Sequence, residues 1–423
     1  MSTAHFTDRS DRYSLANELH ARPFPSLENE SLAVCFALKS ANTDPETRDR
    51  EAAHLIDLLD RYGAPHPPQN SNHYWGKLGR YKLKWERHTE FLTYTLFCED
   101  TGADPFQMPT DIFPQDWQKE APGEIVTASM VHIVRKSDPD ISFISAFFEP
   151  ESLALANVLD DNALVASDFR IDAQGFVRFV VASDPTTGPR RVGRIVQRLF
   201  EIETYKAMSM LSLPAARSVS ADLERLAPQL SQVIASFADD EDNLDANLHK
   251  LLDISAHLEN LTAKNAARFS AAEAYSAIVD QRISVLREQR VGGRQTFAEF
   301  MMRRYQPAIR TCASTAARLS SMTAQTARAG EMLRTRTDFA REEQNQDIME
   351  RMDDRAAQQL KLQKTVEGLS VVAVSYYAVN LAAYLLSPFA GGFGLSKPSL
   401  TALLTLPIIG LVWVMIRNIR KHL

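Results

Sequence analysis

The sequence predicts an α+β protein in three parts: a mixed α/β N-terminal domain, a long helical bundle or stalk, and a C-terminal hairpin of two transmembrane helices. Three observations lead to this prediction. Strand-like and helix-like runs alternate in the first half, helix-forming residues dominate the next part, and two charge-free runs stand at the C-terminal end. We place the three parts at 1–213, 214–365 and 366–423.

Seven runs in the first part have the composition of β-strands. The second and third alternate between apolar and polar residues and stand close enough to form a hairpin. The runs are 32–39, 80–87, 90–97, 124–134, 141–148, 163–169 and 176–183. Pro45, followed by the amphipathic segment 48–62, predicts a helix between the first two runs. Strands with interspersed helices indicate a mixed α/β or α+β domain.

A helix that begins at Gly188-Pro189 carries apolar residues at helical spacing and a row of arginines. The arginines are Arg190, Arg191, Arg194 and Arg198. This basic face has two interpretations, contact with an anionic ligand or lipid and a solvated helix surface. The solvated surface is the more common one.

Residues 215–364 predict about three helices, with breaks near 239–243 and at Gly292-Gly293. The last helix, 294–364, would reach about 105 Å at 1.5 Å per residue, and Pro307 should bend it. Small residues near its middle favour close approach of a partner helix. No strict heptad persists, so we expect a helical bundle rather than a long two-stranded coiled coil. Without Gly or Pro before the apolar run, this helix should continue directly into the membrane.

The two C-terminal charge-free runs are long enough to cross a bilayer. Leu369–Leu386 spans eighteen residues and Leu400–Ile416 spans seventeen, which gives helices of roughly 25 to 27 Å. With flanking residues we predict spans at 368–387 and 399–416, joined by a turn rich in Gly and Pro. The alternative is a pair of buried helices in a soluble core. It is disfavoured because no later segment remains to cover them.

Basic residues predict the orientation of this hairpin. They flank its two outer ends at Arg355, Lys361, Lys364, Arg417, Arg420 and Lys421. The connecting loop carries only Lys397, so both ends should face the cytoplasm. The chain begins without a basic and apolar leader, and we therefore expect no secretory signal.

Tyr376, Tyr377 and Asn380 form the most polar cluster of the first span. Polar groups inside a membrane usually face a helix bundle or a water path. The cluster can therefore pack helices together or line a pore, and packing is the more common role.

Composition and motifs argue against several classes of function. The protein has a formal charge of -6 and a pI of about 6.0, unlike a typical nucleic-acid protein. Cys35, Cys98 and Cys312 are far apart and predict buried apolar residues rather than disulfides or a zinc site. No phosphate-loop, zinc-protease or nucleophile-elbow motif is found. We therefore predict no enzyme activity, no cofactor and no metal.

One short run combines an acid, an imidazole and a guanidinium: Glu18, His20 and Arg22. Pro23 biases Arg22 toward extended geometry. These side chains could clamp a carboxylate or phosphate, or they could tie the N-terminal segment to the domain. From chemistry alone the structural role is the more frequent.

Two segments carry a resemblance to a known family: ELHARPF at 18–24 and VEGLSVVAVSYYAVNL at 366–381. The chain resembles, over essentially its whole length, an uncharacterised bacterial family described as predicted membrane-anchored proteins. The resemblance implies a multi-pass protein of the inner membrane, with both termini in the cytoplasm. It implies no reaction.

The layout is also similar to that of CorA-type magnesium transporters, which join a cytoplasmic α/β domain to a long helix and two spans. In that family a Gly-Met-Asn motif ends the first span. Here the matching place reads Tyr377-Ala378-Val379-Asn380, and only Asn380 could be carried over. This departure argues against magnesium selectivity.

Two functions fit the sequence. The first is a non-enzymatic membrane scaffold or sensor, whose cytoplasmic domain binds a ligand or a protein partner. The second is an oligomeric CorA-like ion channel or transporter, which needs a ring of several chains because two spans cannot enclose a pore. Both predict the lipid bilayer and a homo-oligomer as partners, and neither predicts nucleic acid.

Overall fold

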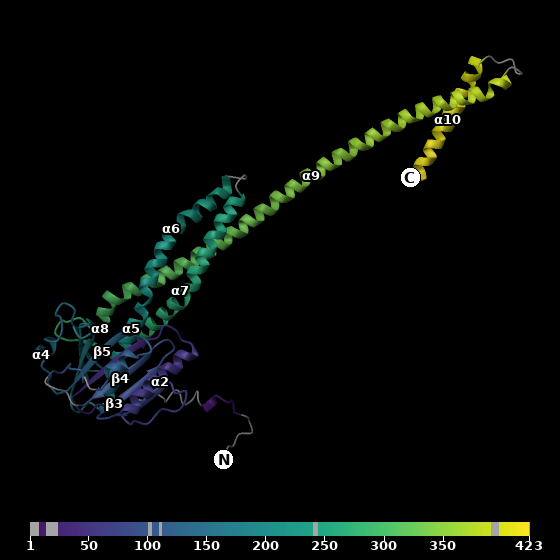
Figure 1. Cartoon of the computed structure of the whole chain (residues 1–423). Coiled ribbons are helices and arrows are strands. Elements are labelled where there is room, and N and C mark those ends of the chain that lie inside the picture. Colours follow the sequence, from purple (N-terminus) through teal and green to yellow (C-terminus); the bar gives the residue numbers. More distant parts are fainter. Residues whose placement is uncertain are drawn as a thin grey trace. The chain divides into compact units, whose positions relative to one another are not determined.

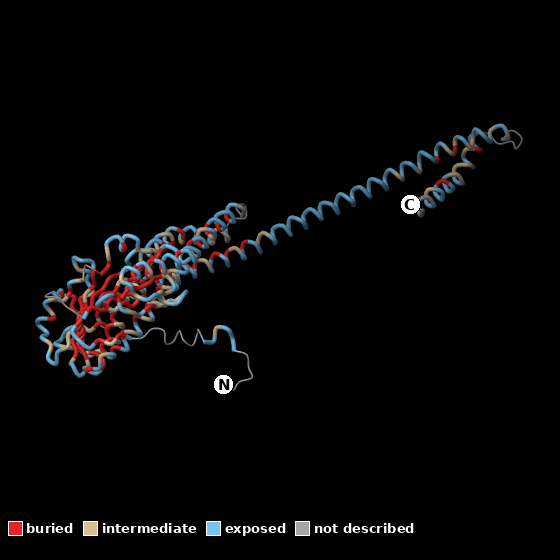
Figure 2. Tube along the Cα trace, turned by 60° about the horizontal axis from the view of Figure 1, so that its bottom comes forward, coloured by how far each residue is buried: buried red, intermediate tan, exposed pale blue. Residues whose placement is uncertain are grey.

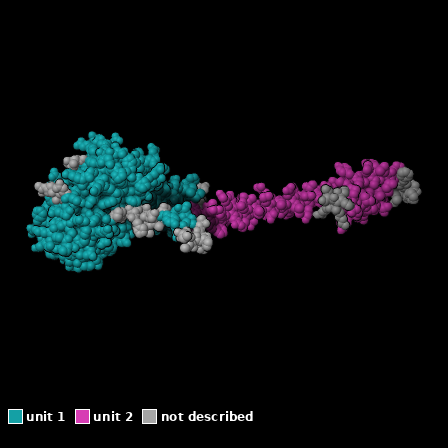
Figure 3. Space-filling model, turned by 90° about the horizontal axis from the view of Figure 1, so that it is seen from below, with its two compact units in different colours: residues 1–329 teal, residues 330–423 magenta. Residues whose placement is uncertain are grey.

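The computed structural model of the protein describes residues 8–13, 24–99, 104–109, 112–239, 244–390 and 397–422. The chain divides into two compact units, residues 1–329 and 330–423 (Figure 3). A mixed sheet with helices lies in the first unit, and apolar helices lie in the second (Figure 1). This arrangement confirms the predicted α+β class. The three boundaries predicted from the sequence stay predictions.

Within the described residues, nine strands form one sheet in the order β2-β3-β4-β1-β5-β8-β7-β6-β9. The pair β5 and β8 is parallel, and the other neighbouring strands that pair are antiparallel. The strands are β1 Ser31–Lys39, β2 His73–Leu78, β3 Tyr81–Arg87, β4 Leu92–Cys98, β5 Glu124–Arg135, β6 Ala154–Val158, β7 Ala163–Ser167, β8 Val177–Ser183 and β9 Gln289–Arg290.

Six of the seven predicted strands are present, and the predicted hairpin is confirmed by β3 and β4, with Trp85 opposite Tyr94. The strand predicted at 141–148 is wrong: helix α4 (Ile141–Ser145) stands there. The Asp140 side chain accepts hydrogen bonds from the backbone N–H groups of Ser142 and Phe143, which starts a helix despite the apolar run.

Three short strands were not predicted. β2 pairs with β3 across a two-residue turn in which Gly79 adopts a φ of 59°, a conformation that favours glycine. β6 and β9 pair with each other at the opposite end of the sheet. Each of these strands is too short, or too interrupted by Gly, Lys and Asn, to show a clear period of two.

Helices cover both faces of the sheet. On one face lie α2 (Pro45–Arg61) and α3 (Gln115–Lys119), whose Leu55, Leu58 and Trp117 pack with the sheet residues of that core. Pro45 occupies the first turn of α2, as the sequence predicted, and the Asp44 side chain caps the helix. On the other face lie α5 (Pro189–Met210), the end of α7 (Leu244–Leu286) and α8 (Phe297–Phe300).

A helical bundle extends from the second face. Helices α6 (Ser212–Asp239), α7 and the first part of α9 (Gln306–Ala390) lie side by side in Figure 1, and the Ser212 hydroxyl contacts the Cys312 sulfur at 3.1 Å. The buried positions on these helices alternate in steps of three and four. On α9 they are Cys312, Thr315, Leu319, Met322, Thr326 and Ala329. A heptad spacing is therefore present after all, hidden in the sequence by Cys, Thr and Ala at buried positions.

The helix predicted from residue 294 begins with a capping box, in which the Thr296 and Glu299 side chains each bond the other's backbone N–H. After α8 the chain forms a π-helical turn, η1 (Met301–Tyr305), and only then the helix α9. Pro307 explains the interruption, because proline has no N–H to donate to the Arg303 carbonyl and its ring crowds that group.

The second unit consists of the rest of α9 and of α10 (Lys397–His422). Helix α9 continues without a break from the charged segment before Lys364 to Ala390, which confirms that continuation. Of the described helices, two are long and apolar enough to cross a membrane, and only 11% of each apolar window is buried (Figure 2). Core helices of soluble proteins are mostly buried, so the low burial argues against the soluble-core alternative.

One close approach fixes how the chain enters the sheet. A Cβ at Gly193, on α5, would lie 1.8 Å from the carbonyl oxygen of Pro25.

We predict that Gly193→Ala lowers the free energy of unfolding by about 1–3 kcal/mol, because the backbone of residue 25 must move. Gly188→Ala, at the start of the same helix, meets no atom within 4 Å and should lower it far less. Urea unfolding of the full chain in detergent, followed by tryptophan fluorescence, compares the two; equal losses would contradict the packing argument.

Candidate functional site

A cavity of about 310 Å³ lies on the sheet face that α5 and α7 cover. Its floor comes from β1, β3 and β4, which contribute Cys35, Lys84, Thr93 and Thr95. Elsewhere on this face the strands present valine and phenylalanine to α5. The cavity therefore occupies the place where the buried face of the sheet changes from apolar to polar.

Lys84 is the buried cation of this cavity, only 4% exposed. Its Nζ lies 3.0 Å from Glu86 Oε2 and donates to Gln197 Oε1 at 3.1 Å. A charge removed from water costs several kcal/mol unless it is paired and hydrogen-bonded. Glu86 and Gln197 supply that compensation, and the second of them links the sheet to α5.

The polar contacts continue from α5 to α7. Gln197 Nε2 donates to Glu201 Oε1 at 2.8 Å, and the other carboxylate oxygen of Glu201 accepts from the Arg282 guanidinium. Lys84, Glu86, Gln197, Glu201 and Arg282 thus form one connected set across three elements. Within this set, the positive charges of Lys84 and Arg282 are balanced by the negative charges of Glu86 and Glu201.

Arg198 adds a positive charge that this set does not balance. It lines the cavity half-buried, and its buried Nη1 has no hydrogen-bond partner among the described residues. Burial, and then the nearby Arg194 and Arg282, lower the pKa of the Arg198 guanidinium. A buried donor without an acceptor is costly, and an anionic ligand would remove that cost.

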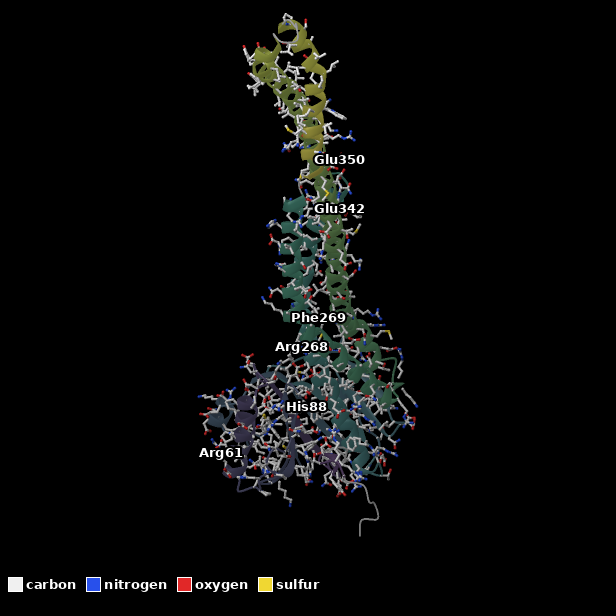
Figure 4. All side chains as sticks on the ribbon, turned by 90° about the vertical axis from the view of Figure 1, so that its right-hand side faces the viewer. Arg61, His88, Arg268, Phe269, Glu342 and Glu350 are labelled. Carbon is white, nitrogen blue, oxygen red and sulfur yellow. The ribbon has the colours of Figure 1, made fainter. Side chains whose placement is uncertain are left out.

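Aromatic rings surround the polar floor. Phe24, Phe91, Phe97, Phe200 and Tyr205 all line the cavity. Phe24 is 47% exposed. Its position is restricted by the next residue, Pro25, whose backbone carbonyl packs against Gly193 of α5. The His88 ring stacks on Phe91 at 4.2 Å between centroids (Figure 4 labels His88). Apolar walls with a few polar groups are typical of small-molecule sites.

An ion pair beside the cavity holds α7 against the sheet. Both terminal nitrogens of Arg268 donate to the Glu90 carboxylate, each at 2.9 Å, and Lys39 Nζ lies 3.5 Å from it (Figure 4 labels Arg268). Such bidentate pairs fix orientation as well as distance. Glu90 lies between β3 and β4. The ion pair therefore fixes the position of α7 relative to the strands that form the cavity floor.

The structure places the sequence-predicted residues as follows. Glu18, His20 and Arg22 lie outside the described residues. Phe24, the last residue of the same motif, lines the cavity. Of the four arginines predicted to form a basic face on α5, Arg198 is the one that lines it.

In the apolar hairpin, Tyr376 and Tyr377 are exposed, 66% and 72%, and their rings lie 5.8 Å apart. Asn380 is half-buried, and its Nδ2 donates to the Tyr376 carbonyl of its own helix at 3.0 Å. The buried residues beside them are Ser375 and Val379. Their roles in packing or in a pore stay predictions.

Lys84, Glu86 and Gln197 were not predicted as site residues. Lys82, Lys84 and Glu86 alternate along a strand, which is typical of a solvent-facing side. The fold instead covers that side with α5 and α7. The run from Glu18 to Arg22 and the row of arginines on α5 both indicated an anionic ligand, and of these residues Arg198 lines the cavity.

Among the described residues, no group of three or more His, Cys, Asp or Glu side chains could hold a metal ion. The chain matches, over residues 7–423, a family described as "Protein of unknown function (DUF3422)". The protein belongs to this DUF3422 family. The match agrees with the expected membership of an uncharacterised family, whereas the two motifs and the CorA-type resemblance stay predictions. None of the curated proteins compared with the chain matches it.

The cysteines of this DUF3422 protein are buried, as predicted: Cys35, Cys98 and Cys312. Burial raises the pKa of the Cys35 thiol to about 12, and the Thr95 hydroxyl donates to its sulfur at 3.5 Å. The thiolate is the reactive form, so Cys35 should be inert near neutral pH.

We predict that an aromatic disulfide reagent at pH 8 titrates no thiol rapidly in the folded chain and all three after denaturation. Absorbance of the released thiolate counts them. A rapid reaction in the folded protein that Cys35→Ser abolishes would show that the thiol on the cavity floor is accessible and activated.

Proposed function

We propose that this protein is a membrane-anchored, non-enzymatic sensor that binds a small anionic molecule in the cavity between the sheet, α5 and α7. The observation that carries the proposal is Nη1 of Arg198, which has no partner among the described residues and lies in a cavity lined by Lys84 and Arg282. A carboxylate or phosphate there would accept hydrogen bonds from Arg198 and leave the Lys84–Glu86 pair intact.

The described cavity residues support binding more than covalent chemistry. Cys35 is kept as a neutral thiol, and the Lys84 ammonium is engaged by Glu86 and Gln197. Activated nucleophiles instead stand beside a base or have a lowered pKa. The cavity has the size and the aromatic lining that are typical of a small-molecule site.

The anchor in this proposal is the C-terminal hairpin in the bacterial inner membrane, with both chain ends in the cytoplasm. Two observations support it: the low burial of the apolar helices and the basic residues at their outer ends. Several copies of the chain, and a cytoplasmic protein that reads the ligand state, would complete the sensor.

The anchor predicts a simple fractionation result. After cell lysis and a carbonate wash at high pH, the full chain should stay in the membrane pellet, because transmembrane helices are not released by charge repulsion. A variant that ends at residue 365 should move to the soluble fraction. Immunoblots of the two fractions measure this, and release of the full chain by carbonate would rule out the spanning hairpin.

The cavity predicts a binding result for the full chain in detergent. Inorganic phosphate and succinate serve as probes in equilibrium dialysis. Arg198→Gln should weaken binding of whichever probe binds by about 10–100-fold, since a charge-assisted hydrogen bond contributes about 1.5–3 kcal/mol. Arg194→Gln, on the same helix but outside the cavity lining, should bind nearly as the wild type does. Equal binding by both variants, or no binding of either probe, would count against an anion site at Arg198.

A further inference from the structure

The charged part of α9 in the second unit is a helix without a covering partner. Every residue from 338 to 366 is exposed, and Figure 2 shows this part of the helix exposed all round. Figure 4 labels Glu342 and Glu350 on it. A helix of this length in water needs either internal ion pairs or a packed face to be stable.

Internal ion pairs do not stabilise this helix well. Among the described residues of the segment, the pair four apart is Arg351 with Asp347, at 3.9 Å. Glu350 and Asp354 carry like charges at the same spacing, as do Arg351 and Arg355. Like charges four apart destabilise a helix by about as much as opposite charges stabilise it, roughly 0.2–0.5 kcal/mol per pair. The segment therefore depends on a packed face.

One face of the segment is uncharged over four turns. We name it the uncharged stripe; its residues are Ile348, Met349, Met352, Ala356, Leu360 and Gln363. Successive members are mostly three or four residues apart, which places them on one side of a helix. Met349, Met352 and Leu360 are 71%, 64% and 58% exposed. Asp347, Asp354 and Lys361 stand on the opposite side, so the segment is amphipathic.

We infer that a second copy of this chain covers the uncharged stripe, in a parallel, in-register helix pair. The inference rests on the membrane-anchored part of the proposed function and is independent of the cavity. Two chains anchored in one bilayer by the same hairpin have the same orientation and bring the same residues to the same height. Confinement to the membrane also raises their effective concentration.

The charges beside the stripe favour this orientation. Asp353 lies along one edge of the stripe and Arg355 along the other. A parallel partner sets the acidic edge of one helix against the basic edge of the other, whereas an antiparallel partner brings like edges together.

Lipid does not account for the stripe equally well. The helix is continuous from Met349 to the predicted span at Gly368. Nineteen residues separate them, a helical rise of about 29 Å. The headgroup and interfacial regions add only about 5–8 Å to each side of the hydrocarbon core. Met349 and Met352 therefore lie beyond the bilayer surface on a helix that leaves it.

Cysteine crosslinking in native membranes tests the register. The three natural cysteines are buried, so a new exposed cysteine on the full chain reports alone. Met352→Cys should form a disulfide-linked dimer on mild oxidation, because a disulfide needs Cβ atoms about 3.5–4.5 Å apart. Asp354→Cys, on the opposite side, is the matched control and should remain monomeric. Non-reducing gels separate the products. Equal crosslinking at both positions, or none at Met352→Cys, would overturn the inference.

A mass measurement in lipid nanodiscs gives a second test that needs no new cysteine. The wild type should have the mass of two or more chains. Met349→Glu combined with Met352→Glu should reduce it to one chain, while Asp347→Ser combined with Asp354→Ser leaves it unchanged. A monomeric wild type, or a multimer that survives the glutamates, would show that the stripe is not the interface. Loss of the anchor would be seen separately, as release of the full chain by carbonate.

Discussion

Burial of the Lys84 ammonium is the constraint around which the first unit is organised. A sheet that presents an ammonium group to its covering helix is stable only if that helix returns an acceptor, and Gln197 provides it. Gln197 in turn orients Glu201, which holds Arg282 of α7. This series of polar contacts thus couples the positions of α5 and α7 over β3 and β4. The same polar residues separate the apolar core beneath α5 from the cavity beside it, because apolar packing cannot continue across them.

The helical bundle is stabilised differently from the sheet and its covering helices. Its buried positions follow a heptad, but α9 fills many of them with Cys, Thr and Ala. Small residues let helices approach closely and bury little apolar area each. The bundle is stabilised by its length and by contacts such as the one between the Ser212 hydroxyl and the Cys312 sulfur at 3.1 Å. The second unit instead leaves large apolar side chains exposed, and this exposure is the basis of the proposed bilayer anchor and of the inferred helix pair.

Sequence reasoning was reliable where one signal dominated. Long apolar runs predicted β1, β5 and β8, Pro45 and the amphipathic segment after it predicted α2, and the charge-free C-terminal runs predicted the apolar helices. It failed where a local cap outweighed composition, as Asp140 did for 141–148. The cavity was harder, because Lys84 and Arg198 are far apart in the chain and look like solvent-facing residues. Lys84 and Arg198 come together only when α5 and α7 pack over β3 and β4 in the tertiary structure.

The way α9 leaves the sheet has a mechanical consequence. Just before it, the Leu155 N–H donates to the Gln295 carbonyl at 2.9 Å, and Phe300 stacks on Phe169 at 4.5 Å between centroids. Tension along α9 within the first unit would therefore pass into β6, the strand next to the edge strand β9, and into this aromatic cluster. A force along a strand acts on several of its inter-strand hydrogen bonds at once, because these bonds run perpendicular to the strand. These contacts at the base of the stalk resist pulling along α9.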